Sequence, residues 1–68
     1  MNLPKPREIL EARERAGLSQ NQAANLVYLK SPTRWSEYER GVRNIDLARW
    51  ELFLIKTGQL PARIPSSA

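Results

Sequence analysis

Three glycines, at positions 17, 41 and 58, each follow a segment whose residues have the pattern of a helix. Glycine often takes the left-handed conformation just beyond the last helical residue, so these positions predict where helices stop. The segments between them leave room only for short helices joined by tight connectors. This spacing predicts a compact all-α fold.

The first two helices are predicted at residues 6–16 and 20–27. Pro6 suits a first helical turn. Ser19 and Gln22 have the spacing of a capping box, in which each side chain bonds the other residue's backbone N–H. The inward side of the first helix is predicted at Ile9, Leu10, Arg13 and Ala16, and that of the second at Ala23, Ala24 and Val27.

The third and fourth helices are predicted at residues 32–40 and 46–57. Ser31 followed by Pro32 is a strong start signal for a helix. The inward residues of the last segment are predicted to be Ile45, Trp50, Phe53 and Leu54. This segment is apolar beyond a single stripe, which indicates either a core helix or a protein–protein surface.

Composition excludes several classes of function. The 68 residues contain no histidine and no cysteine, so the usual general base and the commonest zinc ligands are missing, and disulfides are impossible. We therefore expect no enzyme, no metal and no cofactor. The formal net charge of +4 suits a polyanionic partner.

The length predicts one domain, at residues 1–58, followed by an irregular or disordered tail at 59–68. The longest apolar run, residues 52–55, is far shorter than the ~20 residues of a membrane-spanning helix. The N-terminus lacks the apolar region of a signal peptide. We expect a cytoplasmic, nucleoid-associated protein with no membrane partner and no small-molecule ligand.

The third helix separates polar from aromatic side chains. At about 100° per residue, one side carries the hydrogen-bonding residues Thr33, Ser36, Glu37 and Arg40. Trp35 and Tyr38 fall on the opposite side. A helix with buried aromatic residues and a short polar face suits insertion into the major groove of DNA. An ordinary amphipathic surface helix has the same pattern.

Several motifs in order resemble the Cro/cI-type (XRE) helix-turn-helix family. They are Gly17-Leu18-Ser19-Gln20, Ala23-Ala24, Val27 and Tyr38-Glu39-Arg40-Gly41-Val42-Arg43. The resemblance covers residues 7–57 and implies a four-helix, lambda repressor-like domain that binds double-stranded DNA. Two departures stand out: Tyr28 replaces the family's glycine after the second helix, and the following turn is one residue longer.

A wider set of residues is similar to small phage and mobile-element regulators, among them the anti-CRISPR-associated (Aca) autorepressors. The set is Arg34-Trp35, Tyr38-Glu39, Gly41, Arg43, Trp50-Glu51-Leu52-Phe53 and Lys56-Thr57. This likeness implies that the protein represses its own transcription.

The family resemblance assigns roles to individual residues. The base-reading positions are Pro32, Thr33, Arg34 and Glu37, and the DNA-backbone contacts are Gln20, Lys30, Ser36, Arg40, Arg43 and Asn44. Arg34 suits guanine O6 and N7, and Glu37 suits cytosine N4. The alternative for Glu37 is an ion pair with Arg34 or Arg40. The resemblance also implies a structural salt bridge between Arg13 and Glu39.

A single module of this size makes few DNA contacts, which favours a homodimer on a palindromic operator with recognition helices about 34–36 Å apart. The candidate dimer residues are Leu47, Glu51, Leu54, Ile55 and Leu60. Alternatively, Leu60 folds back on the core. Without a ligand pocket or an activation surface in evidence, the predicted action is repression by blocking a promoter.

Two other functions are open to a chain of this composition. In an antitoxin, the same domain binds operator DNA, and the segment after Gly58 binds a toxin partner. A membrane-surface or protein-interaction bundle requires basic residues along one amphipathic helix. They cluster instead around the first and third predicted helices, which disfavours the second alternative.

Overall fold

The computed structural model describes residues 3–59, which form four helices. They are α1 (Pro6–Arg15), α2 (Gln20–Leu26), α3 (Pro32–Arg40) and α4 (Leu47–Lys56). The predicted all-α fold is confirmed, and every predicted helix end lies within one residue of the observed end. The remaining differences arise because Ala16, Val27, Asp46 and Thr57 are caps that lie just outside the helices.

Side chains at the N-termini explain where three of the helices begin. The Ser19 hydroxyl accepts a hydrogen bond from the Gln22 backbone N–H (3.1 Å), and the Gln22 side chain accepts one from the Ser19 N–H (2.9 Å). Ser31 caps α3 by accepting from the backbone N–H of Thr33, and Asp46 caps α4. These bonds satisfy N–H groups that have no partner within their own helix.

Gly41 ends α3 at a close contact with α1. Its φ of 77° lies in the left-handed region, and a Cβ atom at this position would lie 3.2 Å from Cγ of Pro6. A side chain at position 41 would therefore be both strained and crowded. The C-terminal end of α3 is thus fixed against the start of α1.

Aromatic side chains form the centre of the core. Trp35 of α3 and Phe53 of α4 are fully buried, with ring centroids 4.9 Å apart, and Trp50 stacks on Phe53 at 6.2 Å. The buried set is Ile9, Ala12, Ala23, Ala24, Val27, Trp35, Tyr38, Ile45, Trp50 and Phe53. Among the other predicted inward residues, Arg13, Ala16 and Leu54 are half-buried, and Ala16 and Leu54 pack against this core. Leu10 is also only half-buried and is not among the residues packed against the core, so its prediction was wrong.

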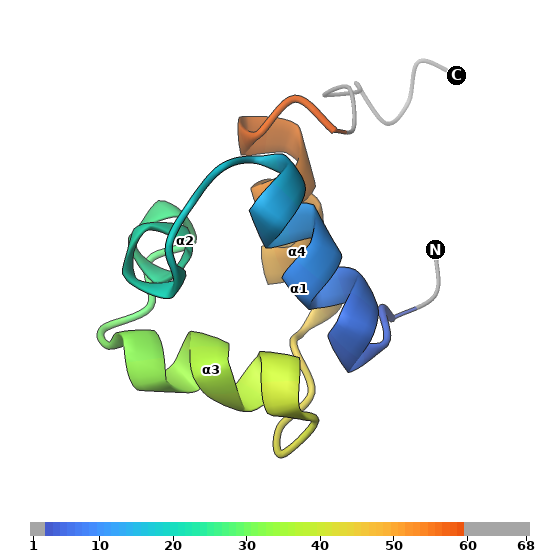
Figure 1. Ribbon diagram of the computed structural model, residues 1–68, viewed down its shortest axis with the longest axis vertical. Coiled ribbons are helices and arrows are strands. Elements are labelled where there is room, and N and C mark those ends of the chain that lie inside the picture. Colours follow the sequence, from blue (N-terminus) through green and yellow to red (C-terminus); the bar gives the residue numbers. More distant parts are fainter. Residues whose placement is uncertain (1–2, 60–68) are drawn as a thin grey trace.

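The helices enclose this core from several sides (Figure 1). Helices α1 and α4 lie side by side, α2 lies across from them, and α3 runs along one end of the molecule. The closest packing of α3 is against α2 and α1. This arrangement leaves one long side of α3 free of the other helices.

Gln59, the first residue of the predicted tail, is hydrogen-bonded to α1. Its amide donates to the Ala12 carbonyl (3.1 Å) and accepts from Arg15 (2.9 Å). The rest of the predicted tail, including Leu60, lies outside the described residues. No helix within residues 3–59 is long and apolar enough to cross a membrane, and no group of three acidic side chains there is placed to hold a metal ion.

Candidate nucleic-acid interface

Helix α3 presents a polar surface to solvent and an aromatic surface to the core. Trp35 and Tyr38 are 0% and 3% exposed, whereas Thr33 and Arg34 are exposed. The solvent-facing residues of α3 are Pro32, Thr33, Arg34 and Arg40, with Ser36 and Glu37 half-buried beside them. The separation predicted from helical periodicity is therefore confirmed.

Glu39 lies on the inner side of α3, where it joins three helices. Its carboxylate accepts hydrogen bonds from Arg13 of α1 (Nε, 2.6 Å; Nη2, 3.2 Å), from the Gln20 amide of α2 (2.9 Å) and from the Trp35 indole (2.5 Å). Arg13 also donates to the Leu18 carbonyl (2.9 Å). The structure thus brings Arg13 and Glu39 together, as the resemblance implied, and adds the Gln20 amide and the Trp35 indole as donors.

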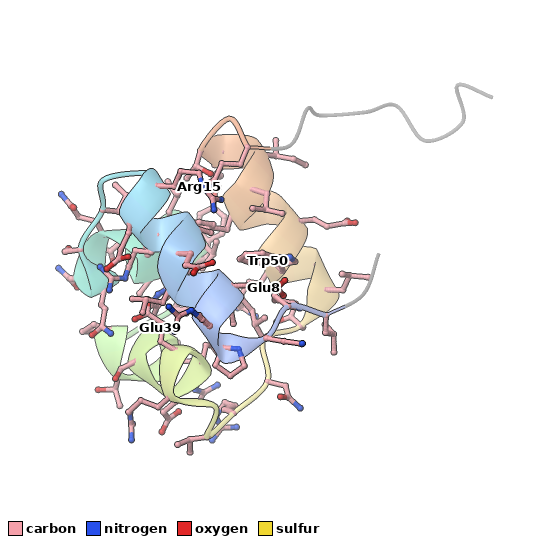
Figure 2. The ribbon with its side chains drawn as sticks, turned by 45° about the vertical axis from the view of Figure 1, so that its right-hand side comes forward. Glu8, Arg15, Glu39 and Trp50 are labelled. Carbon is pink, nitrogen blue, oxygen red and sulfur yellow. The ribbon has the colours of Figure 1, made fainter. Side chains whose placement is uncertain are left out.

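Burial strengthens the hydrogen bonds and the ion pair that Glu39 forms in this cluster. The Glu39 and Arg13 side chains are only 7% and 17% exposed, and Figure 2 shows Glu39 where α1 passes α3. Burial alone would raise the pKa of Glu39, but the hydrogen bonds from Arg13, Gln20 and Trp35 outweigh it and lower the pKa. The carboxylate is therefore held ionised, and it fixes the orientation of α3 on the other helices.

A second acidic residue, Glu37, lies on the outer side of α3 between two arginines. Its Oε1 atom lies 3.3 Å from Nε of Arg34 and 3.2 Å from Nε of Arg43. Of the two ion-pair partners predicted for Glu37, the structure shows Arg34; Arg40 instead donates to the Ser36 hydroxyl (3.3 Å). Arg43 follows the Gly41 turn, which brings it back to Glu37 in a way that helical spacing does not predict.

The remaining predicted DNA-backbone residues surround this surface. Lys30 precedes α3 and Asn44 follows it, and both are exposed. Gln20 is half-buried at the start of α2, where its amide nitrogen is used by Glu39. The Gln20 side chain therefore braces α3 through Glu39.

The turn between α2 and α3 is stabilised by cations from α4. Arg49 donates to the Val27 carbonyl (3.1 Å) and Lys56 to the Leu26 carbonyl (2.9 Å), so both cover the C-terminal end of α2. Neither contact was predicted from the sequence. Their only signal is that both are basic residues on a largely apolar helix.

Tyr28 occupies the turn position at which a glycine was expected, and its φ is 63°. This left-handed conformation is unfavourable for a residue with a Cβ atom. Lys56 offsets the strain, because its ammonium lies 4.1 Å from the ring centroid and donates to the Tyr28 hydroxyl (2.9 Å). That hydrogen bond, together with the positive charge of Lys56, lowers the pKa of the hydroxyl.

This compensation predicts that the effect of Tyr28→Gly on the melting temperature depends on Lys56. In a Lys56→Met background, relief of the left-handed strain exceeds the entropy cost of glycine in the unfolded chain, and the melting temperature is expected to rise by about 4 °C. In the wild-type background the rise should be smaller, because glycine also removes the contact with Lys56. Thermal unfolding of the four variants measures both effects. Equal shifts in the two backgrounds would show that Lys56 does not stabilise the turn.

The exposed side of α4 carries the described candidates for a dimer surface. Leu47 and Ile55 are each 37% exposed, and Glu51 and Leu54 are half-buried. Leu54 also lines a groove of about 390 Å³ with Leu3 and Trp50. Four of the five predicted dimer residues therefore share one helix, and the fifth, Leu60, lies outside the described residues.

A braced helix with a polar, arginine-rich outer side, preceded by a shorter helix and a turn, defines the class of helix-turn-helix DNA-binding domains. A family model for the helix-turn-helix domain matches residues 7–60. The chain therefore belongs to this family, of the Cro/cI type, and is a DNA-binding regulator. No curated protein matches the chain in a sequence search.

Proposed function

We propose that the protein is a homodimeric repressor that binds a palindromic operator with α3 in the major groove. The observation that carries the proposal is the two-sided character of α3. Its outer side carries Thr33, Arg34 and Arg40, which suit bonds to bases or phosphates, and its inner side is fixed by Trp35 and Glu39. A helix held this rigidly suits the reading of base edges.

On this proposal, bases are read from the outer side of the first two turns of α3, where the predicted base-reading positions are Pro32, Thr33, Arg34 and Glu37. Arg34 has a side chain that is 46% exposed and matches the acceptor pair of guanine. Thr33 matches a thymine methyl group, and Pro32 offers apolar contact only. Lys30, Arg40, Arg43 and Asn44 flank this surface and position the domain on phosphates.

A second copy of the chain, paired through α4, doubles these contacts. The exposed side chains of Leu47 and Ile55 favour this helix as the dimer surface. Blocking a promoter requires no further domain, and the promoter proposed is that of the protein's own gene.

The test is a fluorescence titration against the DNA upstream of the gene, with scrambled DNA for comparison, at two salt concentrations. Arg34→Ala is expected to change sequence preference by about fivefold to 150-fold at one base pair. Arg43→Ala should weaken binding to every sequence and reduce the salt dependence by about one unit. Circular dichroism verifies that both variants fold.

Absence of preference over scrambled DNA by the wild-type protein would overturn the repressor proposal. If both variants weakened all sequences equally, the division between base-reading and phosphate-binding residues would be wrong. Co-purification with the product of a neighbouring gene would favour the antitoxin alternative.

A further inference from the structure

We infer that Glu37 is a positioning residue, which acts on DNA sequence through Arg34 instead of contacting a base itself. The inference rests on the proposed DNA-binding function and refines the role of one residue in it. A carboxylate is unusual on a surface that is to meet phosphates, because the two groups repel each other.

The first observation is that the Glu37 side chain is less exposed than the two arginines beside it. The Glu37 side chain is 23% exposed, whereas those of Arg34 and Arg43 are 46% and 52% exposed. The carboxylate is therefore more covered than the two guanidinium groups that bracket it. A group that reads a base edge directly needs to be accessible, and here the arginines are more accessible than Glu37.

The second observation is which arginine atoms Glu37 uses. Both ion pairs are formed by Nε, and both converge on Oε1 of Glu37. Among the described residues, no hydrogen bond engages the terminal Nη atoms of Arg34 or Arg43. The two Nη groups of Arg34 are thus free to approach guanine O6 and N7 end-on, while the carboxylate holds the inner edge of the guanidinium.

The third observation is that Glu37 also fixes the chain after α3. Its backbone carbonyl accepts from the N–H groups of Val42 (3.0 Å) and Arg43 (3.3 Å), and its side chain accepts from Nε of Arg43 (3.2 Å). One residue thereby sets the position of a base-reading arginine and of a phosphate-binding arginine. The carboxylate also offsets one positive charge on this surface, which weakens binding to DNA of arbitrary sequence.

The experiment uses the full chain and a duplex site obtained by selection from random DNA, with each base pair of the site then varied singly. The variants are Glu37→Gln, Glu37→Asp, Arg34→Ala and the double variant Arg34→Ala/Glu37→Gln. Glu11→Gln is the matched control, because it also removes one negative charge and frees an arginine, Arg7, from an exposed ion pair. Circular dichroism verifies that each variant folds.

Glu37→Gln is expected to reduce preference about tenfold at the base pair that Arg34→Ala affects, and the double variant should lose no more than Arg34→Ala alone. Binding to scrambled DNA should become tighter and its salt dependence steeper by up to about one unit. Glu37→Asp keeps the charge but shortens the reach, so it should lose the preference without tighter binding to scrambled DNA. Glu11→Gln should keep the preference.

Three results would overturn the inference. If Glu37→Gln altered a base pair different from that of Arg34→Ala, with additive effects, Glu37 would be a direct reader. If Glu37→Gln only matched Glu11→Gln, its effect would be that of net charge. If Glu37→Asp kept the full preference, the contact with Arg34 would be irrelevant. Failure of the wild-type protein to prefer any sequence is a separate result, which would remove the proposed function itself.

Discussion

Replacing Glu39 by alanine is expected to lower the free energy of unfolding by about 3–5 kcal/mol. The substitution leaves the Arg13 charge buried without its partner, which is far more costly than losing an exposed pair. It also removes the acceptor for the Gln20 amide and the Trp35 indole. Because small domains are only marginally stable, urea unfolding followed by circular dichroism should show a large shift of the midpoint.

Two further variants separate burial from charge. Glu11→Ala breaks an exposed ion pair with Arg7 and should cost no more than about 1 kcal/mol. Arg13→Met/Glu39→Met removes both buried charges at similar volume and should recover much of the loss. If Glu39→Ala cost no more than Glu11→Ala, the cluster would not be what orients α3.

The same cluster predicts that the stability of the folded protein depends on pH in the acid range. The pKa of Glu39 is lowered in the folded protein, since hydrogen bonds from Arg13, Gln20 and Trp35 exceed the opposing effect of burial. Its contribution to stability is therefore complete above the unfolded pKa of about 4.3 and is lost as the pH falls through the lower folded value. The difference in stability between wild-type protein and Glu39→Gln should shrink below about pH 4.

Phe53→Ala is also expected to lower the free energy of unfolding by about 3–5 kcal/mol. The Phe53 ring is 0% exposed and contacts Trp35 of α3 and Trp50 of α4, so its removal leaves a cavity between the two helices. The variant should unfold at lower urea concentration and show altered tryptophan fluorescence before unfolding. DNA binding should fall because α3 loses its support from α4.

Val42→Ala serves as the comparison, because Val42 is 63% exposed and its loss should cost less than about 1 kcal/mol. Phe53→Leu should fall between the two, since leucine fills part of the space. A cost for Phe53→Ala as small as that for Val42→Ala would mean that α4 is not packed on α3 as described.

The helix ends could be predicted because their signals are local. Ser19, Ser31 and Gly41 each act on a backbone group within a few residues, and each has its expected conformation. The two faces of α3 were predictable for the same reason, since helical periodicity needs no knowledge of the other helices. Leu10 fell outside the core because Ile9, Ala12 and Ala16, spaced three and four residues apart, form the inward stripe of α1. Leu10 lies about 100° around the helix from Ile9, away from that stripe.

The contacts that fix the candidate site were harder to predict, because they join residues far apart in the chain. Trp35 lies one turn from Glu39, but Arg13 and Gln20, which share its carboxylate with the indole, come from other helices. The link between Lys56 and Tyr28 requires the packing of α4 beside the turn. The local sequence pattern contains no information on how these residues from different helices come together.

The division of α3 into an inner and an outer side has a consequence for the evolution of new binding sites. Trp35, Tyr38 and Glu39 serve only the scaffold, so residues 33, 34 and 37 are free to change without loss of the fold. Arg34 and Glu37 must change together, however, because each is placed by the other. DNA-sequence preference can therefore be rewritten on this domain in pairs of residues, which gives a small DNA-binding protein a short route to a new target.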